Sequence, residues 1–367
     1  MSRDRKKILF LIPTLFHGGG ERVVSELSLH LSTRLDTVIA LFDEKISYPF
    51  GGRIVSLRTP LSPNLFLGAY LFAVRLLRLH SLLKEEQPDF VVSLGASANI
   101  LSLLAAKNPI VRVDMFISEG RKGFHGTIFR MLVRLLFPRA GRIVAVSQDI
   151  AQDLVSTFRL PAEKIRVIHN PVDIEKISRL SREPIAQEYE QLFQHPVVIA
   201  MGRLREQKGH RYLLSAFALA KKEVPEAKLV ILGEGPLRSA LERQATTLGI
   251  AEDVHFLGWQ ENPFSFLKKS RVFVLSSLWE GLPDVLLEAM ACELPIVSTD
   301  CKSGPREILG SLYGVLVPVK NEPLLAQAIV RVLRDPAFAQ SIALKAKERA
   351  EDFRIEALLE EWYTIFQ

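Results

Sequence analysis

The sequence has few cysteines and no long apolar run free of charge. Its two cysteines, Cys292 and Cys301, cannot form a disulfide framework and lack the spacing of metal ligands, so we expect both to be buried as small apolar residues. Residues 59–74, the longest uncharged stretch near the N-terminus, contain two prolines and fall short of the roughly 18–20 apolar residues of a membrane span. The apolar run after "MSRDRKK" is too short for a typical signal peptide. We therefore expect a cytoplasmic protein.

Several sequence patterns are also missing. No repeat of 20–50 residues is evident, which argues against a solenoid. No Asp-x-Asp occurs, so a divalent metal ion held by such a carboxylate pair is not indicated, and we expect no metal cofactor. The excess of 47 basic over 41 acidic residues suits an anionic partner. However, no helix-turn-helix, RNP-like or zinc pattern accompanies it, so we expect no nucleic-acid partner.

Short apolar, β-branched segments alternate with helical patterns along the whole chain of 367 residues. This alternation predicts an α/β protein with parallel sheets covered by helices on both faces. The pattern restarts after a polar segment at 175–194, which predicts two Rossmann-like domains facing a cleft. We expect domains at 1–172 and 173–352, and a helix at 353–367 that crosses back to the first. The predicted strands are 7–12, 37–42, 53–57, 90–94, 110–117, 142–147, 165–168, 197–201, 228–232, 255–257, 272–275, 296–298 and 315–317.

Three consecutive glycines, Gly18, Gly19 and Gly20, follow the first predicted strand in "HGGGERVVSEL". At a strand-to-helix turn, glycines let the backbone approach a phosphate or a sugar closely, beside the free amides of the helix N-terminus. The spacing is not G-x-G-x-x-G, so a dinucleotide fingerprint is absent. A tight turn without a ligand is the alternative.

The second unit opens with "VVIAMGRLREQKGH", in which a strand ends at Gly202 and Arg203 and Lys208 occupy the loop before a helix. Two cations and a helix N-terminus at the end of a strand can hold a diphosphate through charge-assisted hydrogen bonds. Solvated basic loop residues are the alternative. Two later strand ends could line a nucleotide pocket through Gly233 and Glu234 in "LVILGEGP" and Gly258 in "VHFLGW".

The stretch "LWEGLPDVLLEAMACELPIVS" places Glu288 within a nearly all-apolar helix and Glu280 ahead of it. A buried carboxylate without a partner is costly, so each glutamate needs a partner or a ligand. At 1.5 Å per residue the pair spans about 12 Å, which is too far for one metal ion and suits the two ends of an extended ligand. Pro283 is expected to start the helix, with the amides of Gly281 and Leu282 facing an anion or hydroxyl. A buried salt bridge is the alternative for Glu288.

In combination these motifs resemble the donor-binding half of GT-B glycosyltransferases, in the large retaining group with an E-x7-E motif (glycosyltransferase family 4, group 1 type). "EGLPDVLLEAMACELPIV", "GRLREQKGH", "LGEGPLR", "VHFLGW", "VIHNPVD" and "GGGERVVSEL" carry the resemblance, which spans nearly the whole chain. It implies retaining transfer of a hexose or N-acetylhexosamine from a nucleotide-sugar, with UDP as the expected carrier. The implied acceptor is a lipid-linked or cell-surface glycan.

The resemblance also implies roles for single residues. Arg203 and Lys208 would hold the donor diphosphate. Glu280 would bind hydroxyls of the donor sugar near the Gly281 and Leu282 amides, and Glu288 would bind the ribose. The three-glycine turn would approach the diphosphate and the acceptor from the opposite domain.

The first domain departs from the family pattern. Many members carry a His or a Ser-Glu-Arg/His-like segment after the fifth strand, whereas this chain reads "FISEGRKG". We expect Glu119 to act there, beside Glu280, Arg203 and Lys208, as part of the catalytic set. Without a chelated metal, the cations and helix N-termini must stabilise the leaving diphosphate. We favour front-face attack over a covalent intermediate.

Residues 120–148 contain no acidic residue but six basic ones among many apolar ones, and residues 64–83 have a similar character. Segments 64–83 and 121–142 could therefore lie on an anionic membrane surface, which would make the protein peripheral at the inner face of the cell membrane. Core helices with snorkelling arginine stems are the alternative. For the whole chain, the alternatives are a GT-B-fold sugar-nucleotide epimerase or phosphorylase, or a catalytically silent transferase-like subunit.

Overall fold

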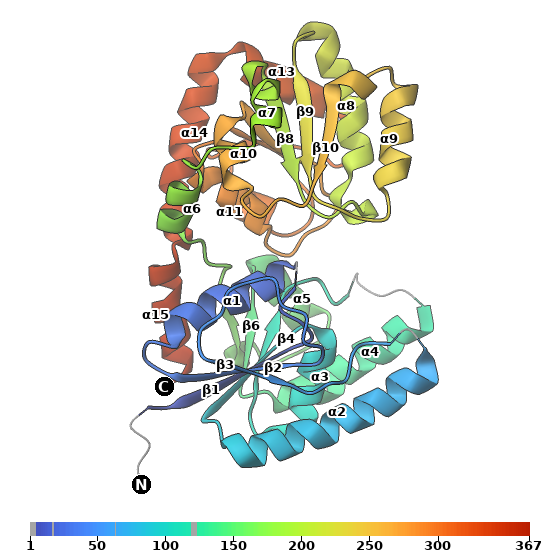
Figure 1. The fold of residues 1–367 in the computed structure, drawn as a ribbon. Coiled ribbons are helices and arrows are strands. Elements are labelled where there is room, and N and C mark those ends of the chain that lie inside the picture. The colour runs from blue at the N-terminus through green and yellow to red at the C-terminus, as the bar shows by residue number, and fades with distance from the viewer. Residues whose placement is uncertain (1–4, 17, 63, 119–122) are drawn as a thin grey trace. The chain divides into compact units, whose positions relative to one another are not determined.

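The structure is a computed structural model that describes residues 5–16, 18–62, 64–118 and 123–367 of the chain. The chain forms two compact units (Figure 1), one made of Met1–Pro171 with Ile355–Gln367 and the other of Val172–Arg354. Each unit has one parallel sheet with helices packed against it, of seven strands in the first and six in the second. The predicted fold class is therefore confirmed.

In unit 1 the strand order is β3-β2-β1-β4-β5-β6-β7, so β1 and β4 are central. The order reverses beside β1, which is where open parallel sheets bind ligands at their carboxyl edge. The strands are β1 Lys7–Ile12, β2 Asp36–Leu41, β3 Arg53–Ser56, β4 Phe90–Leu94, β5 Ile110–Val113, β6 Arg142–Ala145 and β7 Ile165–Val167.

Strand β1 is buried along its whole length, and its side chains alternate between two hydrophobic cores. Ile8, Phe10 and Ile12 belong to the core that includes residues of α1 and α15. Leu9 and Leu11 belong to the core that includes residues of α2 and α3. Unit 1 thus has helices on both faces of its sheet. Its helices are α1 Gly19–Leu31, α2 Leu65–Glu86, α3 Ala96–Ala105, α4 Gly123–Leu136, α5 Gln148–Ser156 and α15 Ile355–Ile365.

Helix α15 is far from the rest of unit 1 in sequence but contributes to its core. Trp362 is buried to 1% exposure and lies in one cluster with the β1 side chains. Phe366 packs on Phe90, with ring centroids 5.1 Å apart, and on Trp362. Large aromatic side chains bury the most apolar surface per residue, so α15 is an integral part of this unit.

In unit 2 the strand order is β10-β9-β8-β11-β12-β13, and one hydrophobic core joins the sheet to α8 and α13. Its strands are β8 Val197–Met201, β9 Lys228–Leu232, β10 Val254–Gly258, β11 Val272–Leu275, β12 Ile296–Thr299 and β13 Val315–Val317. Its helices are α6 Ile174–Leu180, α7 Gln187–Glu190, α8 His210–Glu223, α9 Arg238–Thr247, α10 Phe264–Lys269, α11 Asp284–Ala291, α12 Pro305–Leu309, α13 Glu322–Arg334 and α14 Pro336–Ala350.

One strand boundary differs from the prediction in a way that affects function. The strand predicted at 110–117 ends at Val113, where pairing with β6 stops. The apolar residues Phe116 and Ile117 are buried but lie beyond the ladder. The first polar residue after the fifth strand is therefore Asp114.

Candidate functional site

The predicted residues of unit 2 lie at the carboxyl ends of four adjacent strands, β10, β9, β8 and β11. The Gly202 amide donates to the Leu232 carbonyl at 2.9 Å, and the Gly233 amide donates to the Gly258 carbonyl at 2.7 Å. These bonds link the turns at Gly202, Gly233 and Gly258 to one another. The Gly258 turn also lies beside Glu234, whose Oε1 atom is 3.7 Å from the position of a Cβ on Gly258.

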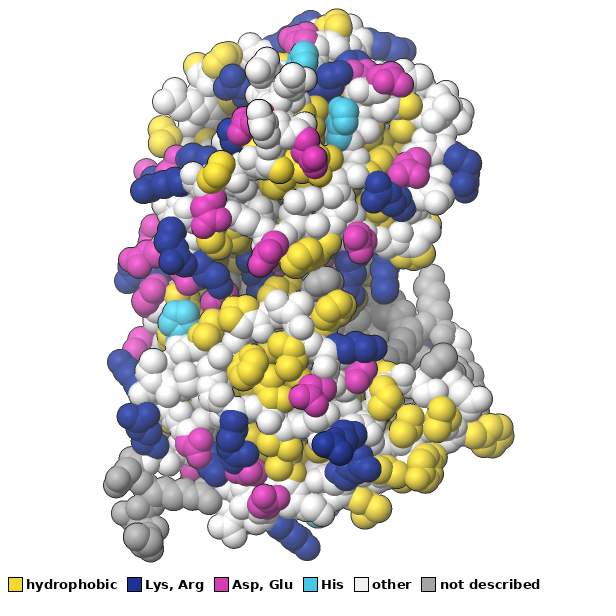
Figure 2. All heavy atoms as spheres, viewed as in Figure 1, with side chains coloured by type: hydrophobic (Ala, Val, Ile, Leu, Met, Phe, Trp, Pro, Cys, Tyr) yellow, Lys and Arg dark blue, Asp and Glu magenta, His cyan; other side chains and the backbone are white. Residues whose placement is uncertain are grey.

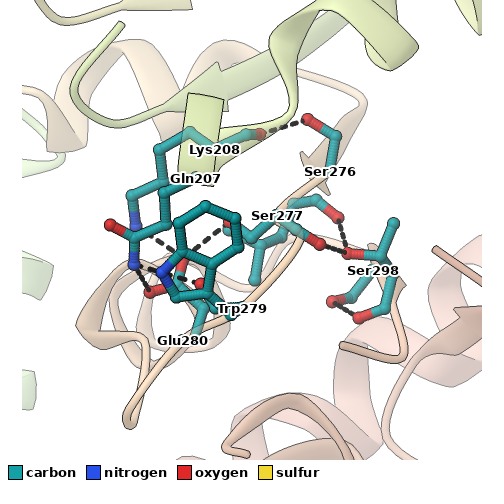
Figure 3. A network of polar contacts seen from close by, with 9 residues as sticks. Gln207, Lys208, Ser276, Ser277, Trp279, Glu280 and Ser298 are labelled. Carbon is teal, nitrogen blue, oxygen red and sulfur yellow. Dashed lines mark hydrogen bonds and ion pairs between the residues drawn. The ribbon is translucent and has the colours of Figure 1, made fainter. Parts of the chain in front are cut away.

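An ion pair joins the loop after β8 to the loop after β11 (Figure 3). Lys208 Nζ donates to Glu280 Oε1 at 2.6 Å, and Ser277 Oγ donates to the same oxygen at 2.5 Å. Gln207 Nε2 donates to the Trp279 carbonyl at 3.0 Å and more weakly to Glu280 Oε2 at 3.4 Å. Three donors thus surround a carboxylate that is only 6% exposed, which explains how it is tolerated there.

The hydrogen bonds on Glu280 are unequally shared between its two oxygens. A carboxylate can accept about four hydrogen bonds. Oε1 already accepts two short ones, whereas Oε2 accepts, from the residues that the structure describes, only the long one from Gln207. Oε2 is therefore the oxygen with capacity to accept hydroxyl groups from a ligand.

The loops after β8 and β11 also contact each other through their backbones. Gly209 has φ 62° and caps α8, and a Cβ on it would collide with the Ser276 carbonyl oxygen. Ser276 Oγ donates to the Lys208 carbonyl at 2.8 Å, and the Leu278 amide donates to the Gln207 carbonyl at 2.7 Å. A residue other than glycine at 209 would push these loops apart, so Lys208 depends on Gly209 for its position.

His210 begins α8 next to Lys208 but adds no positive charge. Burial, together with the neighbouring Lys208 ammonium, lowers the pKa of His210 to about 4. The ring is therefore neutral near pH 7. The positive charges of this loop belong to Lys208 and to two exposed arginines, Arg203 and Arg205.

Helix α11 begins at Asp284 with Pro283 at its N-cap, one residue later than predicted. Glu288 lies in this helix at 3% exposure, and Gly281, Leu282 and Pro283 are buried ahead of it. Both cysteines are free and buried, which confirms the prediction for them. Burial, followed by the charge of Glu288, raises the pKa of Cys292 to about 12, so this thiol is inert.

In unit 1 the three-glycine turn begins α1, with Gly18 at the N-cap. The Glu21 carboxylate folds back to where a Cβ on Gly18 would lie, so a side chain at position 18 would displace it. The Asp114 carboxylate lies beside Gly20. Glu119, the predicted catalytic residue of this domain, lies outside the described residues, as do Arg121 and Lys122.

Sequence reasoning missed several of these polar contacts, above all those of Ser277, Gln207 and Asp114. Each follows a buried strand within a few residues, and that position was the signal available in the sequence. Within the described ranges, no cluster of three or more His, Cys, Asp or Glu side chains could hold a metal ion.

Two Rossmann-like parallel α/β units of this kind make up the GT-B class of glycosyltransferases, and a solved structure supports the assignment. Anabaena HepE in complex with UDP and glucose has a TM-score of 0.80 and 21% identity, with 98% of this chain and 99% of that chain covered.

The sequence relatives define the family. Residues 181–349 match the family "Glycosyl transferases group 1", and residues 17–176 match "Glycosyltransferase Family 4". An uncharacterised glycosyltransferase of Methanocaldococcus jannaschii is 30% identical over 349 residues, or 83% of this chain and 86% of that protein. The N-acetylgalactosamine-N,N'-diacetylbacillosaminyl-diphospho-undecaprenol 4-alpha-N-acetylgalactosaminyltransferase of Campylobacter jejuni is 29% identical, with 95% and 96% covered. The chain belongs to the group 1, family 4 glycosyltransferases, and the predicted enzyme class is confirmed.

The ion pair at the centre of the site predicts strong energetic coupling. Lys208→Met should destabilise unit 2 by about 3 kcal/mol, because it leaves the buried Glu280 carboxylate without its cation. Adding Glu280→Gln should restore more than half of that loss, a coupling that urea unfolding of the two single variants and the double variant would measure.

The exposed pair Lys269–Glu190, 3.1 Å apart in the same unit, is the matched control. Its coupling should stay below about 1 kcal/mol. Additive effects of the Lys208 and Glu280 substitutions would show that the pair does not organise the two loops.

Proposed function

We propose that this enzyme transfers a hexose or N-acetylhexosamine from a UDP-sugar to a lipid-linked glycan acceptor, with retention of anomeric configuration. The observation that carries the proposal is the network of Lys208, Glu280, Ser277 and Gln207 beside the N-terminus of α8. It sets a cation and a hydrogen-bond-accepting carboxylate side by side, which suits the diphosphate and the sugar of one donor molecule.

Each residue has a defined part in this proposal. Arg203 and Lys208 bind the diphosphate together with the amides of the first turn of α8. Glu280 Oε2 accepts hydroxyl groups of the donor sugar near the Gly281 and Leu282 amides. Glu288 binds the ribose hydroxyls.

The proposed transfer is a front-face displacement. The bond from the anomeric carbon to the acceptor oxygen forms on the side from which the diphosphate leaves. The acceptor's proton passes to the departing phosphate oxygen, so no protein base is required. Arg203, Lys208 and the α8 amides stabilise the charge that develops on the leaving group, and on this account no metal ion is needed.

The acceptor class is proposed from the relatives' chemistry. The Campylobacter relative is named for a diphospho-undecaprenol acceptor, and the Anabaena structure holds UDP and glucose. An enzyme that acts on a polyprenyl diphosphate-linked sugar must also bind a membrane surface. Two helices of unit 1, α2 and α4, are suited to this binding.

Helix α2 has an apolar outer stripe. Phe66, Tyr70 and Leu77 are 85%, 64% and 71% exposed (Figure 2 shows hydrophobic side chains gathered over this region). By length and composition the helix could cross a bilayer, but its inner face packs on α3. Its arginines are turned to the protein: Arg75 binds the Thr59 carbonyl, and Arg78 binds the Leu57 and Arg58 carbonyls. The outer stripe is therefore apolar rather than basic.

Helix α4 also packs on α3 and combines both characters. Ile128, Met131 and Leu135 form an exposed stripe at helical spacing. Arg134, next to Leu135, donates to the Thr157 carbonyl at 3.1 Å but remains exposed. We propose that α2 supplies apolar insertion and α4 supplies both apolar contact and charge, which holds the enzyme peripherally at the inner face of an anionic membrane.

Removing either cation tests the diphosphate assignment. Lys208→Ala and Arg203→Ala should each lower transfer by about 10²–10³-fold, because each removes a donor that acts on the leaving group. Radiolabelled transfer from a UDP-sugar measures this, with circular dichroism to check folding. Lys222→Ala, in the last turn of α8, is the matched control and should keep wild-type activity. Near wild-type turnover in both loop variants would mean that the diphosphate binds elsewhere.

The two glutamates should separate the parts of the donor. Glu288→Gln should weaken binding of UDP itself by about tenfold, because a charged hydrogen bond to the ribose is lost. Glu280→Gln should leave UDP affinity within a few-fold of wild type while transfer falls at least a hundredfold. Calorimetry with UDP, run beside the transfer assay, distinguishes them. Equal loss of UDP affinity in both variants would contradict the division of roles.

Membrane binding should depend on both helices in different ways. Phe66→Ser with Leu77→Ser should weaken binding to neutral and anionic vesicles alike, by at least tenfold, because apolar burial is lost. Arg134→Glu should weaken only binding to phosphatidylglycerol vesicles, by about fivefold or more, and salt should have the same effect. Vesicle co-sedimentation measures both. Leu344→Ser, 54% exposed in unit 2, is the control. Equal affinity of the wild type for neutral and anionic vesicles would remove the electrostatic part of the proposal.

A further inference from the structure

A buried arginine of unit 1 connects the ends of β5 and β7 with helix α3. Arg112 on β5 is 1% exposed, and its guanidinium bonds both to Asp114 and to Asn170 after β7. Its carbonyl accepts from Asn99 Nδ2 of α3 at 2.8 Å. Pairing with a carboxylate stabilises the buried guanidinium, and these bonds fix the position of Asp114.

Only one oxygen of Asp114 is used by the network. Oδ1 pairs with Arg112. Oδ2 lies 3.4 Å from the position of a Cβ on Gly20, so it faces the three-glycine turn, and among the described residues it makes no hydrogen bond. The side chain is 28% exposed, which leaves this oxygen within reach of a ligand.

We propose that Asp114 binds the acceptor of the transfer reaction, with Oδ2 accepting a hydrogen bond from a sugar hydroxyl at the three-glycine turn. This inference rests on the proposed function. It adds an acceptor-binding residue in unit 1, at the carboxyl end of β5 and beside the turn that follows β1, where the strand order reverses.

The chemistry of the position favours a hydroxyl. A carboxylate oxygen without a donor needs a proton-bearing partner, and a phosphoryl oxygen has no proton to offer it. Because Glu21 is folded over Gly18, the start of α1 already carries one carboxylate. Gly20 itself has no side chain to shield Oδ2, so a sugar ring can approach it closely. Asp114 therefore positions the acceptor sugar on unit 1 by holding one of its hydroxyl groups.

Two conservative variants test this role. Asp114→Asn removes the charge at nearly constant size. Asp114→Glu keeps the charge and a partner for Arg112 but moves the oxygens by one methylene. Asp36→Asn, which removes an ion-paired carboxylate at the start of β2, is the matched control. Steady-state transfer is measured with UDP-N-acetylgalactosamine and a synthetic polyprenyl diphosphate-linked N-acetylgalactosamine, beside UDP affinity, donor hydrolysis by water and melting temperature.

Both Asp114 variants should raise the acceptor KM at least tenfold, while UDP affinity and donor hydrolysis stay within twofold of wild type. The control should match wild type throughout. Wild-type acceptor kinetics in Asp114→Glu would overturn the inference, and so would a parallel loss of UDP affinity, which would assign Asp114 to the donor.

If the wild-type enzyme makes no product, the result counts against the proposed function. A binding measurement then tests separately whether Asp114 binds the acceptor sugar. Saturation-transfer NMR with methyl N-acetyl-α-galactosaminide in the presence of UDP should show binding to wild type and its loss in Asp114→Glu. No binding to wild type, or equal binding to both proteins, would overturn the inference.

Discussion

The ion pair between Lys208 and Glu280 is the interaction on which the candidate site of unit 2, at the carboxyl ends of its strands, depends. It joins loops from the two central strands, and with Ser277 and Gln207 it makes a buried carboxylate tolerable. In the proposed function, a diphosphate bound at Lys208 would share the ammonium group with Glu280, which would link recognition of the phosphates to that of the sugar.

Much of the fold could be predicted from the sequence because the strands of buried parallel sheets are short apolar runs between polar ends. The predicted bounds of β1, β4, β8, β9, β11 and β13 coincide with the structure for this reason. The candidate site residues of unit 2 could also be located, since Gly202 and Gly233 directly follow such strands and Lys208 and Glu280 lie in the loops after them. The change from an apolar run to polar residues is enough to identify the end of a strand.

Pairing partners could not be predicted in the same way. The sequence from Ile110 continues with apolar residues beyond Asp114, so its pattern predicts a strand to residue 117 and does not mark Asp114 as a residue after a strand end. Nothing in periodicity shows that Arg112 is buried against Asn170, 58 residues away. Likewise, Arg75 and Arg78 look like solvated charges on an apolar helix, and only the position of the loop at 57–60 turns them inward.

The contribution of α15 to the core of unit 1 has a consequence for biosynthesis. Unit 2 is continuous in sequence, whereas the core around β1 needs Trp362, which the ribosome adds only after all of unit 2. Domains fold as units while the chain emerges. Unit 2 can therefore fold as soon as it has emerged, whereas the core of unit 1 is completed only when segment 355–367 follows it.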